Sequence, residues 1–454
     1  VIMATAKMVL VYGAGISGCG AAEELQSQGR QVLLYDDKER ELAPGFDQDA
    51  FVHKGGRIIF GGIDQLLPQV DLIVLSPGVP IDHAPVVAAQ KRGVEIISEV
   101  ELAYRNYPGQ LAAITGTNGK TTTTSIVGAF FKTLPVKTAV GGNIGLALSK
   151  EAKGLDKDSW LAAEISSFQL EAVREFKPKI AVMLNLTPDH IERHHTLAAY
   201  AEAKKKIFAR QDAGDYTVLN YDDPEVRTWG KLTHGTVCYF SRKAVLDNGI
   251  YMQDGNFIIG WQGKKQVVCH KDEMLIFGGH NEENVLAAIA CGYFAGVTVA
   301  NMRQVLKTFK SLEHRIEYIT TIKGVPYYND SKATNTDSTV KALEAFPKGH
   351  IVLLAGGHDK LTDLQPMMEL IREKTDVLIL LGEAKERFNK AALAAGVKNI
   401  VLVDSFQEAV DKAYELAHEP QVVLLSPACS SYDMFHNYPE RGRVFKKMVL
   451  ALPH

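Results

Sequence analysis

Short apolar runs recur along the first hundred residues and alternate with longer segments in which apolar residues repeat at helical spacing. Strand-sized runs lie at 7–12, 31–35 and 71–75, and glycines mark their ends. This alternation is typical of a parallel sheet whose strands are joined by crossover helices. The pattern therefore predicts an α/β domain at the start of the chain.

Two further series of the same kind follow. The second has apolar runs at 111–115, 160–165 and 179–185 and passes into a mixed stretch at 216–277. The third has runs at 351–355, 377–381, 400–403 and 422–426. Helices are predicted at 197–208 and at 406–418, where Phe406, Ala409, Val410, Ala413 and Leu416 share one face. We predict an α/β protein with three domains, at 1–98, 99–311 and 312–454.

Composition supports packed domains and narrows the classes of partner. A chain of 454 residues is too long to form a single hydrophobic core. Of its residues, 46% are hydrophobic and 23% are charged, as is usual for packed globular domains. A net charge of −3 leaves no basic excess for nucleic acid, which is excluded as a partner. Five scattered cysteines fit a reducing cytoplasm, and no apolar run reaches the roughly 20 residues that cross a bilayer. The N-terminus lacks a signal-peptide stretch. We expect a cytoplasmic monomer without membrane contact.

A glycine-rich loop follows the predicted strand 111–115 and begins a helix. It reads Gly116-Thr117-Asn118-Gly119-Lys120-Thr121. Backbone N–H groups at a helix N-terminus bind phosphate, Lys120 can reach terminal phosphates, and the Thr121 hydroxyl suits Mg²⁺. The strict phosphate-loop pattern has glycine where this chain has Ile114, so the motif is a variant. The alternative is a glycine-rich turn without a ligand.

A second glycine motif lies in the first domain. Gly13-Ala14-Gly15-Ile16-Ser17-Gly18 precedes a predicted helix, and Asp36 follows the next strand, which is the layout of a Rossmann-like dinucleotide site. The motif suits NAD or another diphosphate, and a bare tight turn is the alternative. Ser76-Pro77-Gly78 closes another strand toward the same sheet edge, either as a ligand contact or only as a turn.

Two candidate metal ligands follow strands of the second series. Glu164 ends one predicted strand and His190 follows another, beside the phosphate loop. Downstream, Lys204-Lys205-Lys206 lies on the predicted helix 197–208, where a solvated basic face is the default interpretation.

These motifs together resemble the Mur ligases of bacterial peptidoglycan synthesis. The resemblance covers nearly the whole chain and rests on the phosphate loop and six further segments, in family order: Glu164-Ile165-Ser166-Ser167-Phe168-Gln169, Asn185-Leu186-Thr187-Pro188-Asp189-His190, Gly279-His280-Asn281 with Asn284, His314-Arg315, Asn329-Asp330-Ser331-Lys332-Ala333-Thr334 and Ser426-Pro427-Ala428-Cys429-Ser430-Ser431. The glycine motif of the first domain resembles the members that add alanine or D-glutamate. Asn118 before Gly119-Lys120, where the alanine-adding members have histidine, favours D-glutamate. Folylpolyglutamate synthase shares the phosphate loop but lacks such a first domain.

The resemblance implies an ATP-dependent ligase that adds D-glutamate to UDP-N-acetylmuramoyl-L-alanine through an acyl phosphate. It implies a Rossmann-like N-terminal domain that holds the UDP substrate without NAD, a central phosphate-loop ATPase-like domain, and a Rossmann-like C-terminal domain. ATP is a co-substrate, and two Mg²⁺ ions are the implied cofactors.

The resemblance also assigns roles to individual residues. Catalytic residues are Lys120, Glu164, His190 and Lys204. ATP contacts are Gly116, Thr117, Asn118, Gly119, Lys120, Thr121, Thr122, Asn281, Asn284, Arg315, Asp330 and Lys332. UDP-substrate contacts are Ile16, Ser17, Asp36, Ser76, Gly142, Asn143 and Ser166. D-glutamate contacts are Thr334, Lys360, Ser431 and Tyr438.

Metal ligands by this resemblance are Thr121 and Glu164 for one ion, His190 for a second, and Lys204 as a carbamate. Lys205 is the alternative carbamate position, because the spacing from His190 differs by one residue. Simple helix capping is the alternative role for Asn281 and Asn284. Tyr438 stands where the family often has phenylalanine, and His358 receives no role.

Overall fold

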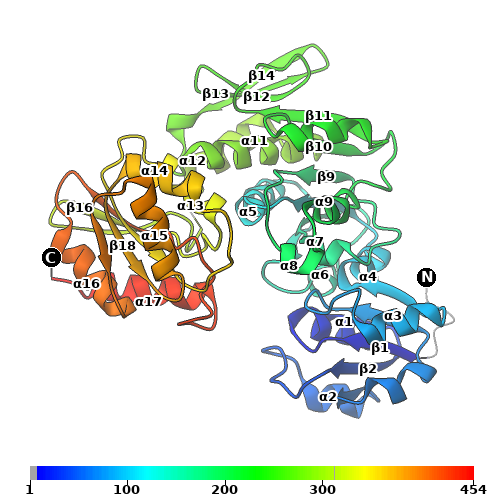
Figure 1. Cartoon of the computed structure of the whole chain (residues 1–454). Coiled ribbons are helices and arrows are strands. Elements are labelled where there is room, and N and C mark those ends of the chain that lie inside the picture. Colours follow the sequence, from blue (N-terminus) through cyan, green and yellow to red (C-terminus); the bar gives the residue numbers. More distant parts are fainter. Residues whose placement is uncertain (1–7, 311, 454) are drawn as a thin grey trace. The chain divides into compact units, whose positions relative to one another are not determined.

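The structure is a computed structural model that describes residues 8–310 and 312–453. The chain divides into two compact units, Val1–Glu273 with Glu283–Lys307 and Met274–Glu282 with Thr308–His454. Figure 1 shows three sheets, each with its own helices; the first two belong to the first unit and the third to the second. The predicted boundary at 98 falls where a strand passes into a helix, and Ser311, at the other boundary, lies outside the described residues. Both boundaries stay predictions.

Sheet A forms from the first predicted series. Its five strands are parallel in the order β3-β2-β1-β4-β5. They are β1 (Met8–Tyr12), β2 (Gln31–Asp36), β3 (Arg57–Phe60), β4 (Leu72–Leu75) and β5 (Glu95–Ser98). The predicted strand 7–12 is confirmed from residue 8, since Lys7 lies outside the described residues.

Both faces of sheet A are covered. The helices α1 (Ile16–Ser27) and α2 (Gln48–His53) contribute to one core, and α3 (Ala84–Lys91) contributes to the other. Glycine is required where α1 begins, because a Cβ on Gly18 would lie 1.7 Å from the carbonyl oxygen of Gly13. The glycine motif therefore allows α1 to pack closely against the end of β1.

Sheet B has nine strands in the order β14-β13-β12-β11-β10-β9-β6-β8-β7. The parallel strands are β6 (Gln110–Thr115), β7 (Thr138–Gly142), β8 (Trp160–Glu164), β9 (Ile180–Met183), β10 (Tyr216–Asn220), β11 (Thr236–Ser241) and β12 (Gly249–Gln253). The mixed stretch 216–277 thus extends the sheet, and it ends in an antiparallel hairpin of β13 (Asn256–Trp261) and β14 (Lys264–His270).

Eight helices accompany sheet B among the described residues. They are α5 (Lys120–Phe131), α6 (Leu148–Glu151), α7 (Ser167–Leu170), α8 (Ile191–His194), α9 (Leu197–Lys205), α10 (Pro224–Thr228), α11 (Gly279–Phe294) and α12 (Val299–Thr308). The predicted helix 197–208 was too long, because α9 ends at Lys205 and the chain turns there to bury Ile207 and Phe208 in the core.

Sheet C has six strands in the order β15-β16-β20-β17-β18-β19, and β15 alone is antiparallel to its neighbour. The strands are β15 (Glu317–Ile322), β16 (Val325–Asn329), β17 (Ile351–Gly356), β18 (Thr375–Leu381), β19 (Ile400–Leu402) and β20 (Val422–Leu425). One face is covered by α13 (Thr336–Glu344), α14 (Gln365–Lys374) and α15 (Lys385–Ala395), and the other by α16 (Phe406–Leu416) and α17 (Tyr438–Leu450). Four of the five predicted apolar residues of α16 are buried, and Leu416 is half-buried.

The helix α4 (Glu99–Asn106) joins sheets A and B within the first unit. Its Leu102 belongs to the core of sheet A, while Val100 and Ala103 belong to that of sheet B. The buried Glu101 carboxylate accepts hydrogen bonds from three consecutive backbone N–H groups, at residues 174, 175 and 176, over 2.9, 2.9 and 3.0 Å. α4 is therefore fixed to sheet B by a fully satisfied buried charge.

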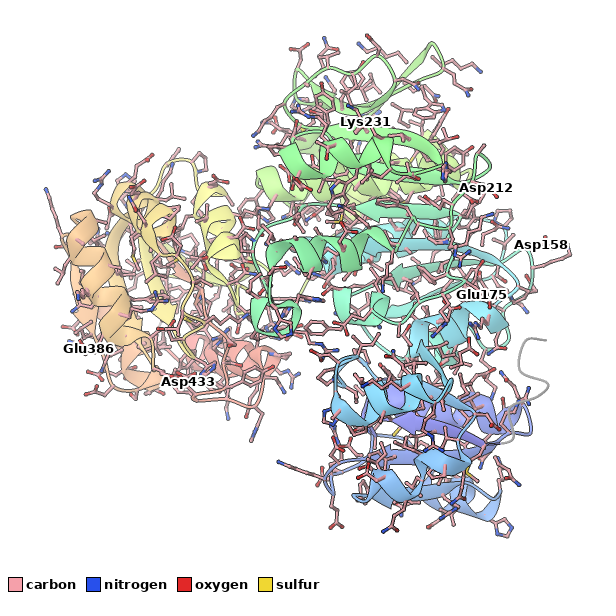
Figure 2. All side chains as sticks on the ribbon, turned by 45° about the vertical axis from the view of Figure 1, so that its right-hand side comes forward. Asp158, Glu175, Asp212, Lys231, Glu386 and Asp433 are labelled. Atoms are coloured by element: carbon pink, nitrogen blue, oxygen red, sulfur yellow. The ribbon has the colours of Figure 1, made fainter. Side chains whose placement is uncertain are left out.

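Arg105 completes this network. Its guanidinium lies 2.8 Å from both Glu101 and Glu95, and 3.2 Å from Glu175, which Figure 2 labels. The arginine side chain is 3% exposed, whereas that of Glu95 is 40% exposed. The pair with Glu101 is consequently the desolvated one.

We predict that Glu101→Ala lowers the free energy of unfolding by roughly 3–5 kcal/mol, because it leaves the buried Arg105 and three backbone N–H groups without this acceptor. Glu95→Ala is the matched control and should cost less than about 1 kcal/mol, since its ion pair is half exposed. All three tryptophans lie with sheet B, so their fluorescence during urea unfolding reports this unit. Equal effects of the two variants would contradict the prediction.

Candidate active site

The phosphate loop connects β6 to α5 at the carboxyl end of sheet B. Its glycines have the positive φ that glycine tolerates, 153° at Gly116 and 86° at Gly119. Lys120 is the first residue of α5, and its Nζ donates to the carbonyl oxygens of Gly116 and Thr117 over 3.0 and 2.7 Å. Ile114 lies within the buried strand, so the bend of the loop begins only after Thr115.

Residues after β9 hold this loop in place. The Asn185 side chain accepts from the Asn118 N–H over 2.8 Å and donates to the Asn118 carbonyl over 3.1 Å. The Thr117 hydroxyl accepts from the Thr187 N–H over 3.0 Å. Asn185 was not among the predicted site residues, although it begins the motif that ends at His190. The structure thus shows two strand ends clamped together at the loop.

Lys204 reaches the loop from α9. It is 1% exposed, and its Nζ donates to the Thr115 hydroxyl over 3.2 Å and to the Gly116 carbonyl over 2.9 Å. Burial, and then the nearby Lys120 charge, holds the pKa of the Lys204 amine well below its ordinary value. A solvated basic face is therefore the wrong interpretation for Lys204.

The two neighbouring lysines point elsewhere. The Lys205 Nζ lies 5.1 Å from the centre of the Trp229 ring and pairs with Glu202 at 2.8 Å. The Lys206 Nζ donates to the Glu171 carbonyl. Of the three lysines, only Lys204 donates to the phosphate loop.

Glu164 ends β8 beside the same loop, and it is 2% exposed. Its Oε1 accepts from the Asn143 side chain over 3.0 Å, while its Oε2 is buried without a hydrogen-bond partner. The Asn143 N–H also donates to the Glu164 carbonyl, and a Cβ on Gly142 would lie 2.3 Å from that oxygen. An orphaned, buried carboxylate oxygen suits a hard cation such as Mg²⁺.

His190 directly precedes α8 and adopts a left-handed backbone conformation with φ 54°. Its ring centre lies 4.8 Å from that of Phe168, in the segment after Glu164. The Nε2 atom lies 3.7 Å from the Asp189 carboxylate, and the side chain is 39% exposed. The ring is therefore held by packing and keeps an exposed edge, and its metal role stays a prediction.

The predicted UDP contacts of sheet A gather at its carboxyl end. Ile16 is 55% exposed at the start of α1, next to Ser17. The Asp36 carboxylate accepts from the Ala14 N–H over 2.9 Å, and the Ser76 hydroxyl donates to the Gly13 carbonyl over 2.8 Å. Ser166, in the first unit as well, caps α7 by accepting from the Gln169 N–H over 3.3 Å.

Asp330 lies at the carboxyl end of sheet C and is 6% exposed. It accepts from the Ser426 hydroxyl over 2.8 Å and from the Ile316 N–H over 3.2 Å. Burial raises the pKa of its carboxyl to about 7, against the opposing effect of these hydrogen bonds and of the Arg315 charge. The Arg315 Nε is itself buried without a hydrogen-bond partner.

The predicted D-glutamate contacts also gather on the loops of sheet C. Ser431 is 2% exposed, Tyr438 begins α17, and the Thr334 N–H donates to the Lys332 carbonyl. The Lys332 Nζ lies 5.3 Å from the centre of the Tyr438 ring. Lys360 is half-buried in the loop after β17. Near it, His358 pairs with Glu383 at 2.6 Å.

α11 begins at Gly279, so Asn281 lies in its first turn and Asn284 lies one turn further in. The Asn281 amide donates to the Phe277 carbonyl over 2.8 Å. In the first unit, the Asn284 Oδ1 accepts from the Thr123 hydroxyl over 3.3 Å, and a Cβ on Gly119 would lie 2.1 Å from it. Asn284 therefore packs directly on the phosphate loop.

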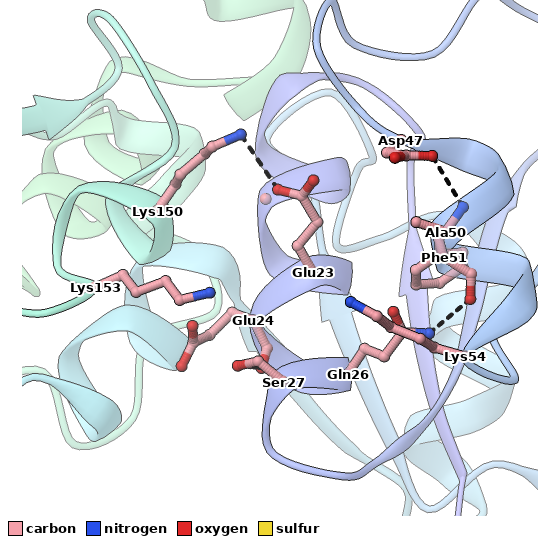
Figure 3. A pocket seen from close by; sticks show the side chains of 11 residues that line it. Glu23, Glu24, Gln26, Ser27, Asp47, Ala50, Phe51, Lys54, Lys150 and Lys153 are labelled. Atoms are coloured by element: carbon pink, nitrogen blue, oxygen red, sulfur yellow. Dashed lines mark hydrogen bonds and ion pairs between the residues drawn. The ribbon is translucent and has the colours of Figure 1, made fainter.

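A separate hollow of about 380 Å³ lies beside α1 and includes residues of α2 and α6 (Figure 3). Lys150 pairs there with Glu23 at 3.3 Å, and Asp47 caps α2. Its lysines and carboxylates balance in sign and favour no one charge of ligand. No helix among residues 8–310 and 312–453 is long and apolar enough to cross a membrane.

Comparison with known proteins matches all three parts of the chain. Residues 7–98 match the N-terminal domain described as Mur ligase MurD-like, residues 114–292 the Mur ligase middle domain, and residues 314–429 the glutamate ligase domain of Mur ligases. The chain therefore belongs to the Mur ligase family, and the predicted three-domain α/β fold is confirmed.

Two proteins that are similar to this chain over nearly its whole length have the same name. The UDP-N-acetylmuramoylalanine–D-glutamate ligases of Thermoanaerobacter sp. (strain X514) and Lachnoclostridium phytofermentans are 44% and 43% identical to this chain, with 98% of each chain covered. Among solved structures, a pseudomurein peptide ligase of Methanothermus fervidus has a TM-score of 0.62 at 18% identity, covering 98% of this chain and 100% of its own. The UDP-N-acetylmuramate–alanine ligase of Thermotoga maritima has a TM-score of 0.61 at 20% identity, with the same coverage. These two structures are similar in fold.

We predict that Asp330 makes folding less favourable as pH rises. The folded state holds its proton up to a pKa of about 7, whereas the ordinary value is 3.8, so its contribution to the free energy of unfolding falls across that window. Urea unfolding of the wild type and Asp330→Asn, followed by circular dichroism at about pH 5 and about pH 8, tests this sign. The wild type should lose stability relative to the variant at the higher pH. A difference that does not change with pH would contradict the assignment.

Proposed function

We propose that this chain is an ATP-dependent ligase that joins D-glutamate to UDP-N-acetylmuramoyl-L-alanine during peptidoglycan precursor synthesis in the cytoplasm. The observation that carries the proposal is the arrangement at the phosphate loop, where Lys204 and Lys120 both donate to the Gly116 carbonyl and the buried Glu164 ends the strand next to β6. It occurs in a chain that is similar over nearly its whole length to ligases named for this reaction. The substrate names come from those relatives.

ATP binding is assigned first to the phosphate loop. The N–H groups of Gly116 to Thr122 and the N-terminus of α5 surround phosphates favourably. Lys120 exchanges its bonds to the loop carbonyls for the terminal phosphates, which makes it the cation nearest the transferred group. The remaining proposed ATP contacts are Asn281, Asn284, Arg315, Asp330 and Lys332.

The proposed reaction has two steps, and neither forms a covalent bond to the enzyme. The alanyl carboxylate attacks the γ-phosphorus of ATP, which gives an acyl phosphate and ADP. The neutral amine of D-glutamate then attacks the acyl carbon, phosphate leaves, and the amine proton passes to solvent or base. The chain serves this chemistry by orientation and charge neutralisation, through Lys120, Arg315 and Lys332.

Mg²⁺ fits the donor set at the loop. The unpartnered Glu164 Oε2 and the Thr121 hydroxyl would hold one ion, and His190 would hold a second with the Lys204 carbamate. When bound, the ions neutralise phosphate charge. Asn143 fixes the Glu164 carboxylate, and hence the direction of its free oxygen.

Lys204 is suited to carbamate formation by its environment. Its low pKa supplies a neutral amine, which can attack carbon dioxide and lose one proton to give a carbamate. The resulting negative charge lies close to Lys120, whose repulsion of the ammonium form becomes attraction. The environment thus favours the modified lysine over the free ammonium.

The other substrates are assigned to the remaining sheets. The UDP substrate is proposed to contact Ile16, Ser17, Asp36, Ser76, Gly142, Asn143 and Ser166. D-Glutamate is proposed to contact Thr334, Lys360, Ser431 and Tyr438. We further propose that the enzyme acts as a monomer, with domains at 1–98, 99–311 and 312–454.

We predict that phosphate release from ATP requires UDP-N-acetylmuramoyl-L-alanine and D-glutamate together, because the first forms the acyl phosphate and the second resolves it. The measurement is coupled phosphate release with each substrate omitted in turn, and with L-glutamate in place of the D-isomer. Equal release with L-glutamate, or without the UDP substrate, would sink the proposal.

We predict that Lys204→Ala lowers kcat by about 100-fold or more, because it removes the proposed carbamate ligand. Lys205→Ala is the matched control and should keep most activity, since its side chain contacts Trp229 and Glu202 instead. Added short-chain carboxylic acids should partly restore Lys204→Ala by supplying the missing carboxylate. A larger loss in Lys205→Ala would transfer the role to that residue.

A further inference from the structure

Arg441 lies on α17 and is 1% exposed. Among the described residues, its guanidinium makes hydrogen bonds only to neutral oxygens. The Nε donates to the Ser331 hydroxyl over 3.0 Å, one terminal nitrogen to the Ser331 carbonyl over 2.8 Å, and the other to the carbonyls of Cys429 and Ser430 over 3.1 and 3.3 Å. In sequence it is one of two arginines, with Arg443, on an amphipathic helix, and no pattern predicted its burial.

These bonds join the loops that follow separate strands of sheet C. Ser331 belongs to the segment after β16, which continues to Thr334. Cys429 and Ser430 belong to the segment after β20, which continues to Ser431. The guanidinium therefore fixes two strand-end loops against each other, and each loop carries a proposed D-glutamate contact.

Two further segments are tied to the same centre. The Ser331 hydroxyl, which accepts from Arg441, donates to the Tyr438 carbonyl over 2.8 Å. The Ser430 carbonyl, which also accepts from Arg441, receives the His358 N–H over 3.0 Å, two residues before Lys360. All four proposed D-glutamate contacts thus lie on segments that converge on one guanidinium.

The charge of Arg441 is left without an ion pair in the described part of the chain. The carboxylates that act on it electrostatically are Asp330 and Asp433. Asp330 is engaged by Ser426, and Asp433, labelled in Figure 2, accepts from the Glu383 N–H over 3.1 Å. Burial lowers the pKa of the guanidinium to about 10, which reflects the cost of this isolated cation.

We infer that Arg441 is a positioning residue of the D-glutamate site, which sets the loops bearing Thr334, Lys360, Ser431 and Tyr438 and supplies positive charge behind them without touching the amino acid. A dicarboxylate bound on these loops provides the negative charge that the arginine otherwise lacks. The inference rests on the proposed function, since it assumes that D-glutamate binds here.

The test is steady-state kinetics of the full-length enzyme with each of the three substrates varied in turn. Arg441→Lys keeps the charge but cannot reproduce the planar set of donors, and Arg441→Gln also removes the charge. We expect the KM for D-glutamate to rise about tenfold in Arg441→Lys and further in Arg441→Gln, with the KM values for ATP and the UDP substrate within about twofold of wild type.

Ser331→Ala provides a milder variant if the arginine variants do not fold, because it removes one acceptor of Arg441 and its link to Tyr438. It should raise the KM for D-glutamate about threefold. Arg372→Met, at an exposed site on α14, is the control and should leave all three KM values unchanged.

A fall in kcat with the KM for D-glutamate unchanged, or an equal rise in all three KM values, would overturn the inference and assign Arg441 a role in folding alone. The proposed function fails separately, if the wild-type enzyme does not consume D-glutamate at all.

Discussion

The burial of a lysine amine beneath the phosphate loop is the constraint on which the rest of the site depends. Lys204 gives its hydrogen bonds to the Thr115 hydroxyl and the Gly116 carbonyl, and Lys120 shares that carbonyl. A second cationic amine this close makes it costly for the buried Lys204 amine to remain charged. The strain is relieved when one amine becomes neutral, or when negative groups arrive. A site that binds phosphate and carries a modified lysine meets both conditions.

The parallel strands explain how residues far apart in sequence come together at the carboxyl edge of each sheet. In each sheet the parallel strands end at one edge, so residues far apart in sequence become neighbours there. Asn185 thus clamps Asn118 across 67 positions, and Ser76 holds Gly13 across 63. Sheet C repeats the arrangement, with Ser426 bonded to Asp330 across 96 positions. The proposed ligand contacts of each sheet lie on the loops at such an edge.

Buried charges in this protein fall into two kinds. Glu101 has donors for both carboxylate oxygens, and it fixes a helix. Glu164 and Arg441 are buried without all the partners that their charges require. One oxygen of Glu164 has no hydrogen-bond donor, and Arg441 has no ion pair among the described residues. A buried charge that lacks a partner lowers the stability of the fold, and such charges are typical of sites where a ligand supplies the missing partner. That contrast separates residues that build the fold from those proposed to serve the reaction.

The strand runs, the phosphate loop and the glycine motif of sheet A could be predicted from the sequence, because they depend on the local spacing of apolar residues and glycines, and the family could be predicted from motifs that occur in family order. The sequence favoured Lys204 over Lys205 through the family resemblance alone, since both lie in one lysine run and only the packing of α9 against the core directs one amine inward. It also gave no sign of Asn185 as a clamp, of the free oxygen on Glu164 or of Arg441. Those properties arise when the ends of distant strands pack together and water is excluded, which only the tertiary structure decides.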